Sequence, residues 1–387
     1  MDSLTRAREL EVNLLADRRF LHQHAEAGME LTVTSKYVMN RLQEMGLEPR
    51  HLGRSGIIAD IRGGMPGKTI LLRADMDALP MSETNELPFR TATCAAHNCG
   101  HDMHTAMLLT AAQILEENRS ELHGTVKLMF QPGEEVFQGA KEMLDAGLLT
   151  EEHVDAAFAM HMTMDAPLGT FAYGEGYMAA SCDGFQITVN GRGCHGAMPD
   201  LGIDPINVGV HIYQAMQNLI ARETPPSETA VLTVGQFSAG TAANVIPSTA
   251  VLEGTLRTYS TELRSKLVKR IREVAERTAA VFNATVEYRT LSAVSPLYVD
   301  PALLHEMLGY IDELDYPFGK SPSYRIMASE DFALISEKIP TVYLSLGGKV
   351  EGNPHPLHHP GVLFNEGALP LGAAIHAQCA FRWLENH

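Results

Sequence analysis

Residues 96–106 read AHNCGHDMHTA, a run that places one thiol, three imidazoles and one carboxylate in a single short segment. Cys99 and His101 are borderline-soft groups of the kind that zinc and its neighbours accept as ligands. A disulfide would need a second cysteine, and a nucleophilic Cys–His pair usually draws its members from distant segments. A metal centre is therefore the first hypothesis, and it requires further ligands from the rest of the chain.

Other candidate ligands follow apolar runs that are typical of buried strands. These runs lie at 69–77, 125–135, 154–162 and 341–348. The polar residues at their carboxyl ends are Asp75, Asp77, Glu134, Glu135 and His161. Helical patterns at 34–46 and 104–118 lie between the runs, and this alternation predicts an α/β fold with a mostly parallel central sheet. Because ligands bind beyond the carboxyl ends of such strands, these residues lie where a site is expected.

The middle of the chain has a different pattern. Between about residues 180 and 292, alternating strands accompany two helices predicted at 204–222 and 261–283, which indicates an inserted α+β domain. The pattern before residue 180 then returns after residue 292. We therefore expect a discontinuous catalytic domain, residues 1–179 and 293–387, interrupted by a smaller domain at residues 180–292.

Bulk composition limits the possible partners. A chain of 387 residues is too long for one ordinary core. Its net charge of −17 argues against nucleic acid and anionic membranes as partners. The amino-terminal segment is charged and amphipathic rather than a signal peptide, and no stretch approaches the roughly 20 apolar residues that span a bilayer. Five irregularly spaced cysteines fit reduced thiols, so we expect a cytoplasmic protein.

The number of candidate ligands favours two metal ions. The segment 353–364, NPHPLHHPGVLF, adds His358 or His359 to the candidates. A catalytic zinc usually takes three protein ligands and water, whereas about five ligands suit two ions roughly 3.5–4 Å apart. Adjacent glutamates on extended backbone point in different directions, so one of the pair at 134–135 should bind metal and the other should act as general base. We expect His97 and His104 to support the site from outside it or to lie at the surface.

Several motifs together resemble a known family. HNCGHDMHTA, FQPGEE, AMHM, GCHGAMPD, AGTAANVIPSTAVLEGTLRT and LHHPGVLF occur in the order found in the aminoacylase/carboxypeptidase group of di-metal peptidases. Within that group the chain is similar to the amidohydrolase branch, which includes auxin-conjugate hydrolases, hippurate hydrolase and N-acetyldiaminopimelate deacetylase. The resemblance runs from about residue 15 to 385. It implies a di-metal catalytic domain with an inserted ferredoxin-like satellite domain.

The resemblance also implies roles for individual residues in the catalytic domain. The implied metal ligands are Cys99, His101, Glu135, His161 and His358. Glu134 corresponds to the general base, and Asp77 matches an aspartate that assists catalysis. Asp75 stands where related peptidases have a metal-binding histidine, so this position departs from their pattern. Asn98 replaces the usual alanine, and the double histidine leaves His359 as an alternative to His358.

Three further matches lie in the satellite domain. His195 matches a histidine that, in family dimers, reaches the partner subunit's site and stabilises the oxyanion. Asn244 and Arg257 match residues that hold the substrate carboxylate or the oxyanion. Outside that domain, Glu330 and Asp331 are either site residues or a helix N-terminal cap, and we favour the cap.

The resemblance implies hydrolysis of the amide bond in N-acyl amino acids, which releases a carboxylic acid and a free amino acid. Two divalent ions are expected, zinc or manganese first and cobalt or nickel as alternatives, in a homodimer formed through the satellite domain. Three other readings stay open. They are dipeptidase or carboxypeptidase cleavage at the same site, a cysteine hydrolase with Cys99 as nucleophile, and a catalytically silent metal-binding homologue.

Overall fold

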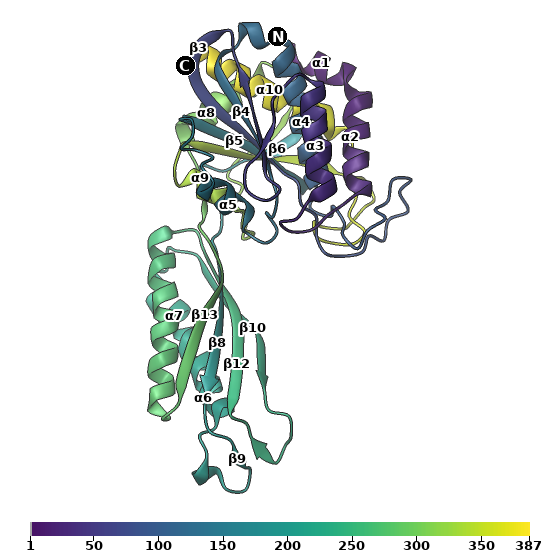
Figure 1. Cartoon of the computed structure of the whole chain (residues 1–387). Helices are drawn as coiled ribbons and strands as arrows, with labels where there is room; N and C mark the ends of the chain where they lie inside the picture. Colours follow the sequence, from purple (N-terminus) through teal and green to yellow (C-terminus); the bar gives the residue numbers. More distant parts are fainter. Residues whose placement is uncertain (1) are drawn as a thin grey trace. The chain divides into compact units, whose positions relative to one another are not determined.

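A computed structural model describes residues 2–387, which form two compact units (Figure 1). The first unit comprises the chain up to Gly176 together with Tyr298–Arg325 and Leu334–His387. The second unit comprises Tyr177–Leu297 and Ile326–Ala333. The second unit is therefore an insertion that interrupts the first.

The first unit is built on an eight-stranded sheet. In spatial order its strands are β1 (Arg50–His51), β2 (Ile57–Arg62), β4 (His123–Gln131), β3 (Met65–Asp75), β5 (Ala156–Pro167), β16 (Thr341–Lys349), β6 (Thr170–Ala172) and β15 (Gly319–Ser321). The four central strands β4, β3, β5 and β16 are parallel, whereas β1, β2 and β6 join antiparallel neighbours. The largely parallel sheet predicted from the sequence is confirmed.

Burial on both faces explains the apolar runs in these strands. Every residue of β16 except its last is buried, and the carboxyl-terminal halves of β3 and β4 are buried as well. Strands of parallel sheets are covered by helices on both faces and so lack the alternation of half-exposed strands. The four central strands therefore hold their carboxyl ends rigidly side by side.

Helices cover this sheet, as Figure 1 shows for α2, α3 and α4. Their bounds are α1 (Ser3–Glu9), α2 (Glu11–Gln23), α3 (Thr32–Glu44), α4 (His101–Glu117), α5 (Gly139–Asp145), α8 (Pro301–Asp312), α9 (Ala333–Ser336) and α10 (Ala368–Asn386). Helices α4 and α10 pack against each other and are buried along most of their lengths. A helix that is apolar on nearly all sides is typical of the interior of a large domain.

Helix α4 begins earlier than its sequence pattern predicted. It starts at His101 rather than at position 104, so His101 and His104 lie on its first turns. Gly100 ends the preceding loop with φ +94°, a conformation that side chains rarely adopt, and a Cβ there would lie 3.0 Å from the Phe364 ring. Glycine at this position therefore lets the loop turn directly into the helix.

The second unit has a ferredoxin-like topology. Its main elements in chain order are β8 (Cys182–Asn190), α6 (Pro205–Asn218), β10 (Ala230–Ala239), β12 (Thr249–Thr258), α7 (Thr261–Val281) and β13 (Thr285–Val294). The antiparallel sheet has the order β10-β12-β8-β13, so a βαββαβ chain forms it. Two short strands also belong to this unit, β9 (Cys194–His195) and β11 (Val245–Ile246), whereas β7 (Gly176–Ala179) and β14 (Leu297–Val299) each include residues of both units. Helix α6 ends at Asn218, and a π-helical turn, Leu219–Glu223, completes the helix predicted at 204–222.

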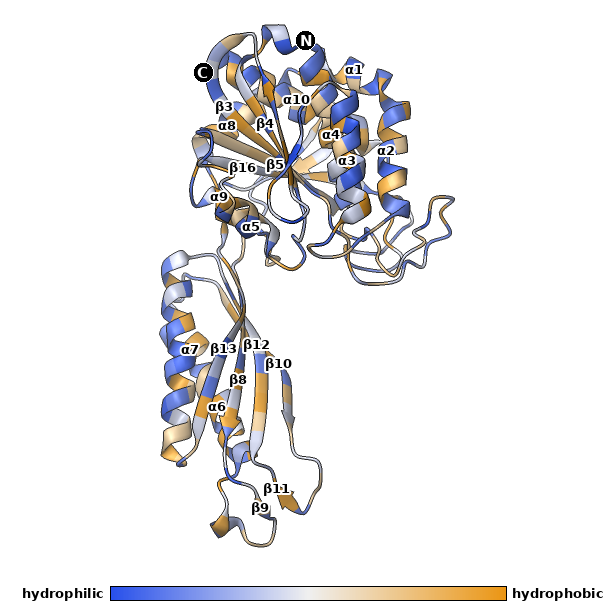
Figure 2. Ribbon diagram, viewed as in Figure 1, coloured by the Kyte–Doolittle hydropathy of each residue, from blue (hydrophilic) through white to orange (hydrophobic). Residues whose placement is uncertain are grey.

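Both helices of the second unit cover the same face of its sheet. Leu252 and Leu256 of β12 join one core with Ile212 of α6 and with Leu267 and Ile271 of α7. Hydrophilic residues line the outer side of α7 in Figure 2. The opposite face of the sheet carries the alternate strand residues and has no helix of this unit over it. Within residues 2–387, none of the helices has the length and apolar character needed to cross a membrane.

Candidate metal centre

A cysteine, a glutamate and a histidine from three distant segments meet in the first unit. Cys99 precedes α4, Glu135 follows β4, and His358 lies in the loop after β16. His358 Nε2 is 3.3 Å from Cys99 Sγ and 3.4 Å from Glu135 Oε1. A thiol, a carboxylate and an imidazole at such distances form a donor set that suits a divalent cation.

Two further histidines extend this cluster. His161 Nε2 of β5 lies 3.4 Å from Cys99 Sγ, and His101 Nε2 of α4 lies 3.9 Å from Glu135 Oε1. Cys99 therefore lies between His161 and His358, and Glu135 lies between His101 and His358. The structure brings together all five residues that the resemblance implies as ligands, and these shared positions are suited to two neighbouring ions.

The ring of His161 is held in the protonation state that a metal ligand needs. Its Nδ1–H donates to the backbone oxygen of Met162 at 2.7 Å, which leaves Nε2 with its lone pair towards Cys99. Burial, and then the neighbouring His104, hold the pKa of His161 well below its usual value. A neutral imidazole with a free nitrogen is the form that binds metal.

Asp77 organises the opposite side of the cluster. Its two carboxylate oxygens accept the backbone N–H groups of Glu134 and Glu135 at 3.0 and 3.1 Å. Its Oδ1 also lies 3.4 Å from His101 Nδ1, so the other nitrogen of His101 points into the cluster. A carboxylate behind a histidine is a common device for orienting a metal ligand.

The electrostatics of the cluster fit cations. Burial, with the nearby carboxylates Glu135, Glu134 and Asp75, raises the pKa of the Cys99 thiol well above its usual value. Burial alone would lower the pKa of His101, but the surrounding carboxylates raise it to about 10. Within residues 2–387, Glu135 Oε1 and His101 Nε2 are buried without hydrogen-bond partners. Such groups are costly to bury unless positive charge compensates them, so the residues present fit a pair of divalent metals.

Asp75 belongs to a buried chain of hydrogen bonds beside the cluster. Its Oδ2 accepts from Arg73 Nη1 at 2.7 Å and its Oδ1 accepts from His104 Nδ1 at 2.6 Å. His104 Nε2 in turn accepts the backbone N–H of Met162 at 2.8 Å, next to His161. The sequence pattern did not predict this series of hydrogen bonds, because only the tertiary structure places β3, α4 and β5 side by side.

Glu134 is the adjacent glutamate that is left for proton transfer. Its side chain is buried, and its carboxylate lies within 4.8 Å of the ligand atoms of His101 and Glu135. Its backbone is fixed by Asp77, as described above. A carboxylate in this place is suited to act as a general base on a water molecule at the metals.

The structure distinguishes the two histidines of the carboxyl-terminal motif. His358 adopts φ +66°, a left-handed conformation, and its backbone N–H donates to the carbonyl oxygen of Asn98 at 2.9 Å. The neighbouring His359 stacks on His355 with ring centroids 3.8 Å apart. Its Nδ1 accepts the N–H of Gly361 at 3.0 Å. The geometry therefore favours His358 as the ligand.

His97 and Asp102 lie behind the metal cluster. Burial lowers the pKa of His97 to about 3, so its ring is neutral in the interior. Asp102 Oδ2 accepts hydrogen bonds from Arg18 Nε at 2.9 Å and from His22 Nδ1 at 2.8 Å. Both partners come from α2, and the sequence pattern alone did not indicate their role.

His195 and Asn244 lie together in the second unit. Short strands β9 and β11 pair there, and Gly196 N–H donates to the Asn244 carbonyl oxygen at 2.8 Å. Ala197 N–H donates to His195 Nδ1 at 3.1 Å, so the proton of the neutral ring resides on Nε2. Because His195 is exposed, this Nε2–H is available as a hydrogen-bond donor.

Arg257 lies at the other end of the same unit. It is near the carboxyl end of β12, whereas the segment with Asn244 leads into the start of that strand at Thr249. Eight residues of extended strand span roughly 26 Å. The structure therefore does not bring Arg257 together with His195 and Asn244 within one chain.

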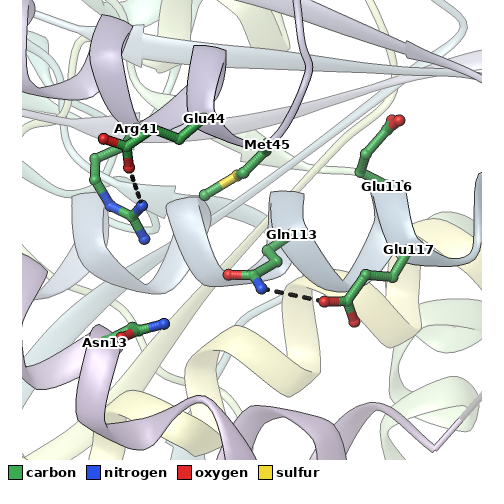
Figure 3. A pocket seen from close by; sticks show the side chains of 7 residues that line it. All are labelled: Asn13, Arg41, Glu44, Met45, Gln113, Glu116 and Glu117. Carbon is green, nitrogen blue, oxygen red and sulfur yellow. Dashed lines mark hydrogen bonds and ion pairs between the residues drawn. The ribbon is translucent and has the colours of Figure 1, made fainter.

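A separate pocket of about 250 Å³ lies among α2, α3 and α4 (Figure 3). Its three acidic residues have partners, because Glu44 pairs with Arg41 at 2.6 Å, Glu116 with Arg119 at 3.1 Å and Glu117 with Arg6 at 2.8 Å. It contains no residue of the metal cluster.

A buried sulfur, nitrogen and oxygen donor set at the carboxyl edge of a largely parallel sheet, together with the inserted ferredoxin-like unit, defines a metal-dependent hydrolase. Residues 71–382 match the peptidase family M20/M25/M40, and the chain belongs to that family. The family, the fold class and the hydrolase class expected from the sequence are confirmed.

The relatives extend over nearly the whole chain. N-acetylcysteine deacetylase of Bacillus subtilis is 36% identical over 379 residues, which cover 96% of this chain and 97% of that protein. Thermostable carboxypeptidase 2 of Saccharolobus solfataricus is 34% identical, with 97% and 96% covered. The crystal structure of the Bacillus subtilis YXEP protein, a dinuclear metal-binding peptidase of the M20 family, has a TM-score of 0.84 and 34% identity and covers 98% of this chain and 100% of its own.

Proposed function

We propose that the protein hydrolyses the amide bond of N-acyl amino acids and uses two divalent metal ions to do so. The observation that carries this proposal is that five donor groups converge around Cys99 and Glu135 while Glu134 lies beside them as a further carboxylate. An amidohydrolase needs this combination of cations and a separate proton carrier. The name of the related N-acetylcysteine deacetylase supports an acyl amino acid as substrate.

The metals would be held by Cys99, His101, Glu135, His161 and His358, and they would supply Lewis acidity to the amide carbonyl and lower the pKa of a water molecule. Glu134 removes a proton from the attacking water and later delivers it to the departing amine. Asp77 keeps Glu134 in place through the backbone N–H and directs His101 Nε2 inward. Asp75, through His104, holds the backbone beside His161.

The substrate's polar ends are assigned to residues of the second unit. Arg257 binds the carboxylate of the amino-acid moiety, and Asn244 contributes to holding the carboxylate or the oxyanion. His195 of the partner subunit donates its Nε2–H to the oxyanion. The separation of roughly 26 Å along β12 supports a second subunit as the source of this histidine.

We further propose a homodimer formed through the second unit. Several large apolar side chains of this unit are exposed, namely Met198, Leu201, Ile206, Val210, Tyr213, Phe237 and Val245. Three of them lie at i, i+4 and i+7 on the outer side of α6, and β10 is an unpaired sheet edge. Exposed apolar side chains on an unpaired face are typical of protein contacts. Residues 1–179 with 293–387 would then be the catalytic domain, and residues 180–292 the dimerisation domain.

Zinc or manganese is the proposed metal, with cobalt and nickel as alternatives. Thiolate and imidazole ligands favour zinc, whereas the carboxylate also admits manganese. The five cysteines are all free thiols, which supports a reducing, cytoplasmic environment.

The proposal is tested by an activity screen on metal-quantified protein. N-acetyl, N-benzoyl and other acyl amino acids are incubated with the enzyme, and the free amine released is measured before and after treatment with a chelator. We expect amine release that disappears with the chelator and returns with zinc or manganese. Protein that contains no metal and cleaves no substrate after supplementation would refute the proposal and favour a silent homologue.

The second candidate function is carboxypeptidase or dipeptidase cleavage, supported by the related thermostable carboxypeptidase 2. Both reactions cleave an amide next to an amino acid with a free carboxylate. Unmodified dipeptides in the same screen separate the two. Faster cleavage of dipeptides than of acyl amino acids would favour the second candidate.

A further inference from the structure

Arg257 lies on the helix-free face of the sheet in the second unit. Its neighbours in β12, Leu256 and Thr258, are buried, and Leu256 contributes to the core under α6 and α7. Because side chains alternate along a strand, Arg257 points to the opposite face, where it is half-buried.

One nitrogen of the Arg257 guanidinium is fully engaged by the protein. Nη1 donates to the backbone oxygen of Met327 at 3.0 Å and to Ser329 Oγ at 2.8 Å. Nη1 carries two hydrogens, so these two acceptors use both of them. The acceptor segment is itself attached to the unit, because Ala180 N–H donates to the carbonyl oxygens of Ile326 and Ala328, each at 3.1 Å.

The other edge of the guanidinium is unused by the protein. No residue from 2 to 387 forms an ion pair with Arg257, and its Nε and Nη2 make no hydrogen bond with that part of the chain. The N–H groups on Nε and Nη2 are parallel and match the two oxygens of a carboxylate. A half-buried arginine that is fixed on one side and lacks an acidic partner can bind an anion from outside the protein.

We propose that Ser329 is a positioning residue for substrate selection: by fixing Nη1, it presents the Nε–Nη2 edge of Arg257 side-on to the carboxylate of the substrate. This inference rests on the proposed function and adds to it a geometric basis for preferring a free carboxylate over an amide. A carboxylate accepts both N–H groups, whereas a primary amide offers one acceptor oxygen and an NH₂ group that faces a donor. Without Ser329, the guanidinium rotates more freely and loses part of this preference.

The test compares the best acyl amino acid substrate with its primary carboxamide, in the metal-loaded enzyme and in the variants Ser329→Ala and Ser329→Thr. We expect Ser329→Ala to raise KM for the carboxylate substrate roughly 3- to 10-fold, the loss of one hydrogen bond to a charged group, with kcat nearly unchanged. KM for the carboxamide should stay constant, and Ser329→Thr, which keeps the hydroxyl, should restore the wild-type values.

Ser238→Ala is the matched control, because Ser238 lies on β10 of the same unit and its hydroxyl accepts from Gln236 instead. Calorimetric titration with both compounds at low temperature compares their dissociation constants directly. An equal rise of KM for both substrates, a fall in kcat alone, or no change in Ser329→Ala would overturn the role of Ser329. A wild-type enzyme that neither binds nor cleaves the acyl amino acid overturns the proposed function itself.

Discussion

At the scale of single residues, the two adjacent glutamates have different proposed roles, Glu135 as a metal ligand and Glu134 as the general base. Asp77 accepts both of their backbone N–H groups, and the two carboxylates both lie within 4.8 Å of the ligand atoms of His101. Glu135 Oε1 faces His358 and His101 at 3.4 and 3.9 Å, while Glu134 remains beside them as a separate buried carboxylate. The two glutamates therefore differ in their partners, because the Glu135 carboxylate faces two of the histidine ligands.

Replacing Glu134 with glutamine should remove the proton carrier and keep the metal ligands. We expect kcat to fall by about 10²–10⁴-fold while the metal content per subunit stays at the wild-type level. Kinetics and elemental analysis on the same preparation provide the measurement. Glu142→Gln is the control, because Glu142 pairs with Arg54 at the surface. A metal-loaded Glu134→Gln enzyme with normal turnover would contradict the assignment.

The two histidines at positions 358 and 359 provide a second test at this scale. His358→Ala should lower metal content and abolish most activity, because its Nε2 faces both Cys99 and Glu135. His359→Ala should retain both properties, because that ring stacks on His355. Metal analysis of the two variants decides between them. The reverse pattern would move the ligand to His359.

At the scale of elements, α2 holds the start of α4 through buried charges. Arg18 and His22 lie one turn apart on α2, and both donate to Asp102 in the first turn of α4. His22 Nε2 lies 3.2 Å from both carboxylate oxygens of Glu83, in the loop after β3. A ring that donates from both nitrogens must be an imidazolium. This arrangement fixes the helix turn that carries His101.

This buried imidazolium predicts a pH dependence of stability. Burial lowers the pKa of His22, but the hydrogen bonds with Asp102 and Glu83 outweigh it and raise the pKa to about 9. Because the folded pKa is above the unfolded value, the contribution of His22 is complete below about pH 6.5 and is lost as the pH rises through about 9. We expect the free energy of unfolding to fall by at most roughly 3 kcal/mol over that range.

His22→Gln should remove this pH dependence, because glutamine cannot carry the charge. Urea unfolding of the wild type and the variant at several pH values between 6 and 10 is the measurement. His153→Gln, at a side chain that is 84% exposed, should behave like the wild type. Parallel curves for the wild type and His22→Gln would show that the imidazolium does not stabilise the fold.

At the scale of the whole molecule, the metal centre connects segments that are distant in the chain. Cys99, Glu135, His161 and His358 come from four separate parts of the first unit. Ions that bind only the folded protein stabilise it by mass action. We expect chelation to lower the melting temperature, and added zinc or manganese to restore it in a concentration-dependent manner. Identical melting curves with and without the chelator, on protein shown to have lost its metal, would contradict this prediction.

The proposed dimer gives a second prediction at this scale. Val210→Asp introduces a charge into the apolar face of α6 and should shift the protein to monomers in analytical ultracentrifugation. Its activity should fall as well, since His195 is proposed to act in the partner subunit's site. Val281→Asp, at a residue 75% exposed at the end of α7, is the control and should leave the oligomeric state unchanged. A fully active monomer would contradict both the proposed dimer interface and the proposed role of His195 in the partner subunit's site.

The sequence by itself determined the family, the largely parallel sheet and the residue types of the metal cluster. These features follow from local order, because apolar runs, turn residues and ligand types can be read along the chain without knowing what lies across it. The strand predicted at 341–348 is an example, because the structure has a strand at Thr341–Lys349. The motif at 96–106, which is read directly from the chain, is another. Even here the start of α4 was predicted three residues late, since the packing of Gly100 against Phe364 is a tertiary contact.

Only the tertiary structure decided which groups face one another. It turned His358 towards Cys99 and His359 away, placed Asp75 between Arg73 and His104, and separated Arg257 from His195 along β12. It also brought Ser329 to Arg257 across 72 residues of chain. The physical reason is that the direction of a side chain and the identity of its neighbours depend on packing between distant segments, for which the local pattern holds no information.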